Sequence, residues 1–489
     1  MCVTDKIKTV AEIGQLLSER SGKKVVLCHG EFDLLHFGHT RYFKAARKFG
    51  DLLVVTLTPD RFIAKGPGRP VFNENQRAEA IANLAFVDYV AINEWPTAIE
   101  TLQTIKPDIY VKGSEYLGKV DVTGRLQAEK DLIESLGGKM EFTHEIIFSS
   151  SKLLNNNFDV FTKASKPFLS ELAAKTKDTE ILAALADLAS KRVLVLGDLG
   201  LEEINLIRDI ERAKLSERFV QPQGALLGLN FLAHFCERLD FLSVGSVDQQ
   251  LVQPFMPTSV FADLIADERL SYPSSRRFID ADTGFRRLSL LDQKHAPLKI
   301  EQEAKVLERL ERNLSDYDLV MVFEMGRGFL SQSIKEHLSA KAPFLALHLN
   351  VEDPAHLREC LNGYGKLDLM VAPQDQIGEA LEQQLLSEPL WRNNADLLIT
   401  EANGALHRQC ATGLCELPPF VAQPASLLPI DWSSTVFALI APLVQAQAPQ
   451  DWQLLIGGAA AAMTRQAAKA PFKLEKMLFE KFVIALLNR

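Results

Sequence analysis

Four short apolar runs recur in the first third of the chain. They fall at residues 23–28, 52–57, 87–92 and 109–111, and a helical pattern with one apolar face precedes them at residues 5–20. Short, mainly apolar runs of this length are typical of strands that are buried on both faces of a parallel sheet. Because parallel neighbours need a crossover connection, usually a helix, the pattern predicts βαβ units and an α/β fold.

The same kind of pattern starts again in the middle of the chain. An apolar run, RVLVL, opens at residues 192–196, after a stretch rich in Ala, Leu, Lys, Glu and Asp. That stretch does not have the Gly/Ser composition of a flexible linker. We therefore predict an α/β domain over residues 1–154, a helical linker over 155–190 and a larger α/β domain over 191–489.

Composition excludes several classes of protein. Lys and Arg number 54 against 63 Asp and Glu, and 47% of residues are hydrophobic, which is ordinary for a globular protein. The acidic balance argues against a nucleic-acid partner. The amino-terminal residues are polar and charged, and no apolar run reaches the ~18–20 residues that span a bilayer. The six cysteines form no CxxC pair, so we expect free thiols, no protein-built metal site and a cytoplasmic protein without a membrane partner.

The strongest chemical signal is the sequence HFGH at residues 36–39. It directly follows the first predicted strand, at the start of a predicted helix. His36 and His39 are three residues apart and share one helix face, while Gly38 allows a ligand to approach the backbone closely. The helix N-terminus adds N–H donors and positive potential. A histidine pair can also be purely structural, but its place after the first parallel strand favours nucleotide chemistry.

Three further segments have compositions that suit phosphate binding. They are KGPGRP at 65–70 with Arg77 beyond it, KGSEY at 112–116 after the fourth strand, and SSSK at 149–152 before an apolar helical start. Serines at a helix N-terminus are explained as caps, and the same hydroxyl and N–H groups also hold phosphate oxygens. Taken alone, Lys65 and Arg69 are explained as surface charges.

These segments, in this order, carry a family resemblance over residues 24–154. GEFDLLHFGH, Gly50-Asp51, KGPGRP, Gln76-Arg77, KGSEY and FSSSKLL resemble the cytidylyltransferase-like nucleotidyltransferases, whose hallmark is HxGH. Within them the chain is most similar to the adenylyltransferase part of bifunctional heptose-phosphate kinase/adenylyltransferases, and then to glycerol-3-phosphate cytidylyltransferases. The resemblance implies a Rossmann-like domain that transfers AMP or CMP from ATP or CTP to a sugar or polyol phosphate. Pyrophosphate is released, and the product is an activated precursor for surface polysaccharides.

The resemblance also implies roles for individual residues. His36, His39 and Lys65 would be catalytic, and Asp33 and Arg77 would lie at the acceptor and reacting phosphate. The nucleotide pocket would contain Glu31, Phe32, Gly38, Lys112, Gly113, Glu115, Ser149, Ser150 and Ser151, and Mg²⁺ would bridge the triphosphate. Two departures are mild, since Glu115 replaces an Asp and Ser150-Ser151 replaces Thr-Thr. Residues 120–134 look like an insertion.

The chemistry expected of such a site needs no enzyme nucleophile. The acceptor phosphate is already ionised near neutral pH, so catalysis is mainly positioning and electrostatic stabilisation of spreading charge. This explains a site made of His, Lys, Arg and helix N-termini.

The second domain resembles the ribokinase-like, PfkB-type sugar kinases. VLVLGD at 193–198, Gln223-Gly224-Ala225 and EMGRGF at 324–329 match their order of motifs. Their Gly-Ala-Gly-Asp motif corresponds here to Asp431-Trp432-Ser433-Ser434, which puts Ser434 at the position of the base. Because a serine cannot act as that base near neutral pH, we predict a kinase-like domain without kinase activity, used for dimerisation, scaffolding or regulation. Related fusions imply a homodimer.

Several alternatives stay open at this point. Asp431 could act as a displaced base, which would make the chain an active bifunctional sugar kinase/nucleotidyltransferase. Both halves could instead be a non-catalytic nucleotide-binding scaffold. HxGH also occurs in class I aminoacyl-tRNA synthetases, although no basic anticodon-binding region is evident. The sequence leaves open ATP or CTP, and the identity of the acceptor phosphate.

Overall fold

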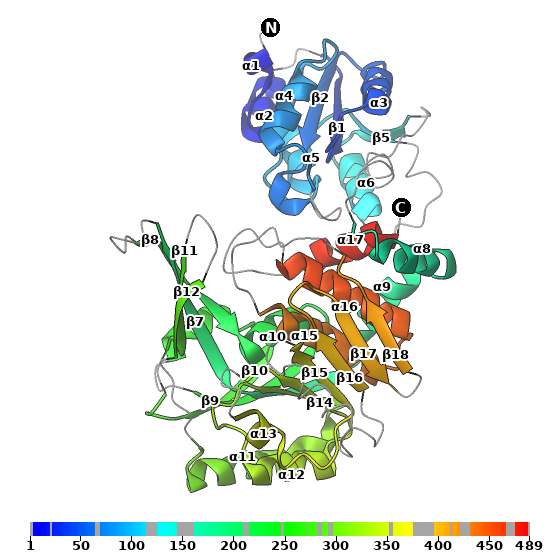
Figure 1. The fold of residues 1–489 in the computed structure, drawn as a ribbon. Helices are drawn as coiled ribbons and strands as arrows, with labels where there is room; N and C mark the ends of the chain where they lie inside the picture. Colours follow the sequence, from blue (N-terminus) through cyan, green and yellow to red (C-terminus); the bar gives the residue numbers. More distant parts are fainter. Residues whose placement is uncertain are drawn as a thin grey trace. The chain divides into compact units, whose positions relative to one another are not determined.

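A computed structural model describes most of the chain. The described residues are 3–19, 22–63, 69–113, 125–143, 161–208, 215–245, 249–270, 272–280, 286–291, 297–351, 356–374, 396–410, 413–420, 431–465 and 475–487. Two compact units are formed, by Met1–Val160 and by Phe161–Leu487. Each is built on a mainly parallel sheet with helices packed on it (Figure 1), so the predicted α/β fold class is confirmed.

The first unit contains a five-stranded, fully parallel sheet in the order β3-β2-β1-β4-β5. Its strands are β1 (Val25–Gly30), β2 (Leu52–Leu57), β3 (Tyr89–Ile92), β4 (Ile109–Lys112) and β5 (Lys139–Phe142). Its helices are α1 (Val3–Lys6), α2 (Val10–Ser18), α3 (Phe37–Arg47), α4 (Glu74–Ala82), α5 (Ile99–Ile105) and α6 (Arg125–Ser135). The four strands that the apolar runs predict are confirmed as β1 to β4.

Apolar side chains fill both faces of this sheet. In β1, Val26 and Cys28 belong to one core cluster, whereas Val25 and Leu27 belong to another on the opposite face. Period-two alternation sends successive side chains to opposite faces, and here both faces are covered. β1 lies between β2 and β4, where the order of strands reverses. Ligands of open α/β sheets bind at the carboxyl ends of strands next to such a reversal.

Two expectations for this unit need correction. The single helix predicted over 5–20 is divided into α1 and α2, because Ile7 forms a parallel bridge to Val90 at the edge of the sheet. Thr9 then starts α2 with a capping box to Glu12. Residues 125–134, predicted as part of an insertion, lie in α6. This helix is in the crossover that the parallel pair β4 and β5 requires.

The second unit contains two sheets. The larger has nine strands in the order β10-β9-β6-β13-β14-β15-β16-β17-β18, of which β10 to β16 are parallel and the last two antiparallel. The smaller has the order β12-β11-β7-β8. The strands are β6 (Arg192–Gly197), β7 (Leu199–Ile207), β8 (Leu215–Gln223), β9 (Arg238–Gly245), β10 (Val260–Ala266), β11 (Ser275–Asp280), β12 (Arg286–Leu291), β13 (Leu319–Glu324), β14 (Leu345–Leu349), β15 (Leu369–Pro373), β16 (Asp396–Thr400), β17 (Leu406–Cys410) and β18 (Gly413–Leu417).

Helices cover both faces of the nine-stranded sheet. They are α8 (Ser165–Lys175), α9 (Asp178–Asp187), α10 (Gly224–Leu232), α11 (Ile300–Asn313), α12 (Gln332–Lys341), α13 (Leu357–Leu361), α15 (Trp432–Gln445), α16 (Gln450–Arg465) and α17 (Lys476–Leu487). α11 and α12 share one apolar core with the central strands. α10 and α15 pack on β13. The stretch predicted as a linker contains α8 and α9, which contact α17 within this unit.

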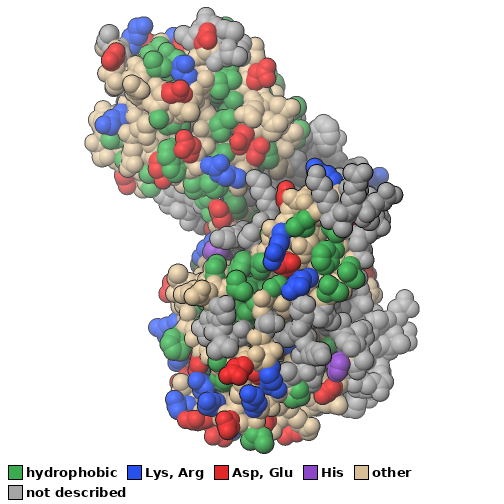
Figure 2. All heavy atoms as spheres, turned by 90° about the vertical axis from the view of Figure 1, so that its left-hand side faces the viewer, with side chains coloured by type: hydrophobic (Ala, Val, Ile, Leu, Met, Phe, Trp, Pro, Cys, Tyr) green, Lys and Arg blue, Asp and Glu red, His purple; other side chains and the backbone are tan. Residues whose placement is uncertain are grey.

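The surface carries both signs of charge. On the face shown in Figure 2, Lys and Arg side chains are intermingled with Asp and Glu side chains over both units. Within the described part of the chain, none of the helices has the length and apolar character needed to cross a membrane.

Gly138 offers a test of how tightly the first unit is packed. A Cβ at this position, just before β5, would lie 2.6 Å from the carbonyl oxygen of Pro107 and 2.8 Å from Ile133. We expect Gly138→Ala to destabilise the protein by about 1–3 kcal/mol, as overpacking usually does. Gly365→Ala is the control, because a Cβ there meets nothing within 4 Å. Calorimetric unfolding of both variants checks this, and equal midpoints would contradict the packing described here.

Candidate functional site

The two histidines of the HFGH sequence lie together at the carboxyl end of β1. His36 is the N-cap of α3, and its Nδ1 accepts a hydrogen bond of 3.1 Å from the Gly38 backbone N–H. The rings of His36 and His39 stack with centroids 4.0 Å apart. Because Nδ1 of His36 is an acceptor, its neutral ring carries the proton on Nε2, which makes Nε2 a donor. The structure thus brings His36, Gly38 and His39 together, with the N–H of Gly38 used for capping.

The aromatic ring of Phe32 packs against His39 of this pair. Its φ of +47° is in the left-handed region, and its ring meets the edge of His39 at a centroid distance of 5.3 Å. The ring also contacts Phe43, and a Cβ at Gly30 would lie 2.8 Å from it. Left-handed backbone at a bulky residue has a cost and is found where the surroundings enforce it. Phe32, predicted to bind nucleotide, is 8% exposed and fixes the orientation of the His39 ring.

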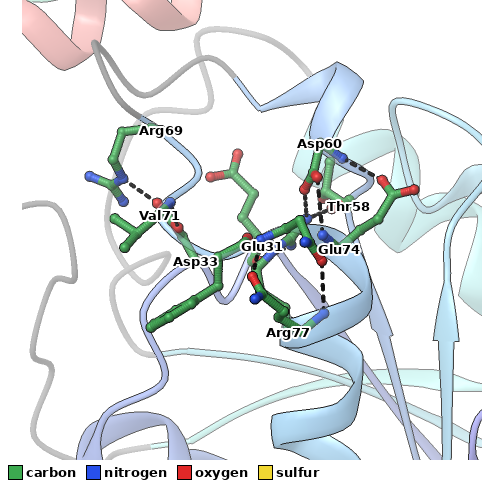
Figure 3. A network of polar contacts seen from close by, with 11 residues as sticks. Glu31, Asp33, Thr58, Asp60, Arg69, Val71, Glu74 and Arg77 are labelled. Carbon is green, nitrogen blue, oxygen red and sulfur yellow. Dashed lines mark hydrogen bonds and ion pairs between the residues drawn. The ribbon is translucent and has the colours of Figure 1, made fainter.

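Arg77 holds the loops around the site in place (Figure 3). Its Nε donates to the Phe72 carbonyl at 3.0 Å, its Nη1 donates to the Glu31 carbonyl, and its Nη2 donates to the Thr58 carbonyl at 2.9 Å and to Asp60. Four of the five guanidinium N–H groups therefore bind protein oxygens. Arg77 is 2% exposed. Sequence reasoning assigns Arg77 to substrate, but in the structure its charge joins the ends of β1 and β2 to α4.

Asp33 and Arg69 form a second buried pair. Asp33 is 1% exposed; its Oδ2 accepts from Nε of Arg69, and its Oδ1 accepts from the Val71 backbone N–H at 2.5 Å. The Arg69 side chain is also 1% exposed. The explanation of Arg69 as a surface charge is therefore wrong. The sequence gives no sign that Arg69 lies next to Asp33, because 36 residues separate Arg69 from Asp33 along the chain.

The buried charge of Lys112 is paired with a carboxylate of the fold. Its Nζ lies 2.8 Å from Oε2 of Glu129 on α6 and 4.8 Å from the centre of the Tyr110 ring, and the Tyr110 hydroxyl donates to the same Oε2 at 3.0 Å. Burial raises the pKa of Glu129, but the Lys112 charge and these hydrogen bonds outweigh it and hold that pKa below its ordinary value. Glu129 is a residue that sequence reasoning missed. The signal that points to it is a lysine at the end of a buried strand, which needs an acidic partner.

The remaining predicted site residues divide into two groups. Gly113 directly follows β4, which pairs with β1, so it lies at the same strand ends as the histidines. The residues Lys65, Glu115, Ser149, Ser150 and Ser151 lie outside the described residues.

The described residues also allow a test of the fit to Mg²⁺. Among them, no three His, Cys, Asp or Glu side chains are grouped to hold a metal ion, and both carboxylate oxygens of Asp33 already accept hydrogen bonds. Mg²⁺ commonly keeps several waters and binds through substrate phosphates with one or two carboxylates.

In the second unit, an arginine fills the space at the carboxyl ends of β6 and β13. Asp198, which follows β6, accepts from two backbone N–H groups of the 325–327 loop at 3.1 and 3.3 Å. Nη1 of Arg327 donates to Ser274 at 2.8 Å, and Nη2 to Gln223 at 3.4 Å. A Cβ at Gly200 would lie 2.9 Å from Nη1. The guanidinium therefore lies between the smaller sheet and the turn that starts α10.

The N-terminus of α15 carries its own carboxylate. Asp431 accepts from the Ser434 N–H at 3.2 Å, from the Ser434 hydroxyl at 2.6 Å and from the Ser433 hydroxyl at 2.8 Å. Ser434, at the predicted position of the base, is fully buried. Anions bind at helix N-termini because of the free N–H groups and the helix dipole. At α15, the Asp431 carboxylate already occupies the N-terminus of the helix.

The first unit is similar in sequence to known proteins. Residues 27–156 match the Cytidylyltransferase-like family. The chain is 42% identical over 136 residues to the bifunctional protein HldE of Campylobacter curvus, covering 27% of this chain and 29% of that protein. It is also 42% identical over 139 residues to HldE of Syntrophotalea carbinolica, covering 28% and 26%. The first unit thus contains a cytidylyltransferase-like domain, and the chain spans less than a third of the length of these relatives.

Solved structures similar to this chain include sugar kinases. Ribokinase from Thermotoga maritima has 14% sequence identity and a TM-score of 0.44, covering 60% of this chain and 99% of its own. Phosphofructokinase-2 from Escherichia coli has 12% identity and a TM-score of 0.47, covering 61% and 100%.

The buried pair of Lys112 and Glu129 gives a pH-dependent prediction. Glu129→Gln removes the carboxylate that pairs with the buried Lys112 charge, and breaking such a pair costs about 3–5 kcal/mol at pH 7. Because folding lowers the pKa of Glu129, its contribution to stability is present above the unfolded value of 4.5 and is lost as pH falls through the lower folded value. We expect the difference in free energy of unfolding between wild type and Glu129→Gln to become smaller from pH 7 to pH 3. Urea unfolding across this pH range measures it.

Glu134→Gln on the same helix is the matched control, since its contact with Lys130 is 4.0 Å long and half exposed. We expect it to change stability by less than about 0.5 kcal/mol. A Glu129→Gln effect that is equally small at pH 7 would contradict the pairing.

Proposed function

We propose that the first unit is a nucleotidyltransferase acting on a nucleoside triphosphate and a small sugar or polyol phosphate. It transfers AMP or CMP to the acceptor phosphate and releases pyrophosphate, which gives an activated precursor of the kind used for surface polysaccharides. The observation that carries the proposal is the stacked His36–His39 pair at the start of α3. The match of residues 27–156 to the Cytidylyltransferase-like family and the likeness to HldE support it.

The reaction proceeds by one in-line displacement. An acceptor phosphate oxygen forms a bond to the α-phosphorus, while the bond from that phosphorus to the bridging oxygen of the leaving pyrophosphate breaks. A phosphate monoester has its second pKa near 6, so the attacking oxygen is ionised without a general base. The chain positions the phosphates and stabilises negative charge that spreads over the transferred group. Mg²⁺, carried by the triphosphate, supplies further neutralisation when bound.

The histidines suit this task better than the arginine and the lysine at the neighbouring strand ends. Asp60 binds Arg77, and Glu129 binds Lys112, so both charges are compensated within the protein. His36 lies at the positive end of α3, and the hydrogen bond that its Nδ1 accepts from the Gly38 N–H fixes the ring and the direction of the Nε2 donor. A donor already held in place costs no reorganisation when the charge develops.

We also propose that the second unit has no sugar kinase activity and serves as a scaffold. A sugar at the carboxyl ends of β6 and β13 would have to displace the Arg327 guanidinium from Ser274 and Gln223. A phosphate at the N-terminus of α15 would have to displace the Asp431 carboxylate. Both changes leave buried polar groups without partners, which is costly.

Pyrophosphate release by the full-length protein tests the first proposal. We expect turnover with at least one pairing of an NTP with a sugar or polyol phosphate. His36→Asn keeps a capping side chain, since Asn is a good N-cap, but removes the Nε2 donor, so kcat should fall about 10²–10³-fold. His337→Asn, on α12 of the second unit, is the control. Unchanged turnover in His36→Asn would refute the role of the pair.

ATP-dependent phosphorylation of a panel of unphosphorylated sugars and polyols tests the second proposal. We expect no product above background, because Ser434 cannot remove a hydroxyl proton near neutral pH. Clear turnover that is lost in Asp431→Asn would show instead that Asp431 is a base and that the chain is a bifunctional enzyme.

A further inference from the structure

Arg69 is a buried arginine whose terminal nitrogens are unused. Its side chain is 1% exposed, and Nε donates to Asp33. In the described part of the chain, neither Nη1 nor Nη2 has a hydrogen-bond partner. Buried polar groups are almost always hydrogen-bonded, and each exception calls for an explanation. Two buried nitrogens with four N–H groups on one cation indicate an anionic ligand that supplies the missing acceptors.

The surroundings of Arg69 fix its guanidinium in one orientation. Asp33 binds Nε with one oxygen, and the Val71 backbone N–H holds the other oxygen of the same carboxylate. The nitrogens left over, Nη1 and Nη2, form a planar fork that matches two oxygens of one phosphate. Figure 3 shows Arg69 and Arg77 on opposite sides of Asp33 and Glu31. Among the described residues, the Nη groups of Arg77 bind protein oxygens, whereas those of Arg69 do not.

We propose that Arg69 binds the phosphate group of the acceptor substrate through Nη1 and Nη2, an inference that rests on the proposed function of the first unit. Arg69 follows β2, and Gly113 follows β4, and these strands flank β1 on opposite sides. The proposed nucleotide pocket includes Gly113 on the β4 side. Asp33 lies in the loop from β1 to His36, so its partner Arg69 lies beside the loop that carries the histidine pair.

The pair with Asp33 determines how Arg69 recognises its ligand. Because Asp33 compensates the charge, geometry more than net charge provides the recognition, and the fork selects a group with two adjacent anionic oxygens. Lysine at this position keeps a charge for Asp33 but offers a point charge without the fork. Comparing arginine with lysine at this position therefore distinguishes phosphate recognition from the stability of the buried pair.

Steady-state kinetics of the full-length protein test the proposal. In Arg69→Lys, we expect the KM for the acceptor to rise about 10- to 100-fold, the value of one or two charged hydrogen bonds. The KM for the NTP and the kcat at saturating acceptor should stay close to wild type. An increase in the KM for the NTP, with that for the acceptor unchanged, would overturn the assignment to the acceptor.

A double variant separates binding from a structural role. Asp33→Asn with Arg69→Gln removes both charges and keeps an oxygen for the Val71 N–H. If Arg69 only balances Asp33, this double variant restores the KM for the acceptor, and that result would overturn the proposal. We expect the KM to stay raised. Arg61→Gln is the matched control, because Arg61 lies on the same connection and donates to the exposed Glu94 carbonyl.

Calorimetric titration with inorganic phosphate gives a readout independent of turnover. Wild type should bind phosphate more tightly than Arg69→Lys by about 10-fold or more, and Arg61→Gln should match wild type. Equal affinities in wild type and Arg69→Lys would overturn the proposal for Arg69 alone. If wild type and all variants lack turnover with every substrate pair while this difference in affinity is present, the proposed function fails and the phosphate site at Arg69 stands.

Discussion

Buried charge must be compensated inside a protein, and this constraint decides which cations of the first unit are available to a substrate. Desolvating an ion costs several kcal/mol unless a partner of opposite charge and further hydrogen bonds are present. Arg77 meets this requirement with Asp60 and three carbonyl groups, and Lys112 meets it with Glu129. Two cations that follow or end strands of this sheet are therefore paired with carboxylates of the fold.

The same constraint explains the second unit. At the carboxyl ends of its central strands, where α/β sheets bind ligands, Arg327 occupies the space beside Ser274 and Gln223. At the start of α15, the Asp431 carboxylate takes the donors that an anionic ligand would need. Both positions are filled and hydrogen-bonded by the chain itself. Internal groups therefore occupy these polar positions at the carboxyl ends of the sheet and at the start of α15.

The pattern of apolar residues along the sequence predicted the fold of the first unit well, but it did not predict the ion pairs. Apolar runs are a property of consecutive residues, so β1 to β4 and the helix after His36 could be read directly. The stacking of His36 on His39 follows from their spacing on α3. The pairing of Lys112 with Glu129 depends on how α6 crosses the sheet, and Arg69 reaches Asp33 only in the folded state. Ile7 divided a predicted helix by pairing with Val90, an example of tertiary contact overriding a local pattern.

The proposed chemistry transfers a nucleotidyl group by positioning and charge, without a covalent intermediate on the enzyme. The most direct measurement is the stereochemical course at the α-phosphorus. It uses the full-length protein and one diastereomer of an NTP that carries sulfur on that phosphorus. A single in-line displacement predicts inversion of configuration in the sugar or polyol product. Retention would require two successive displacements through an enzyme nucleophile and would contradict the claim.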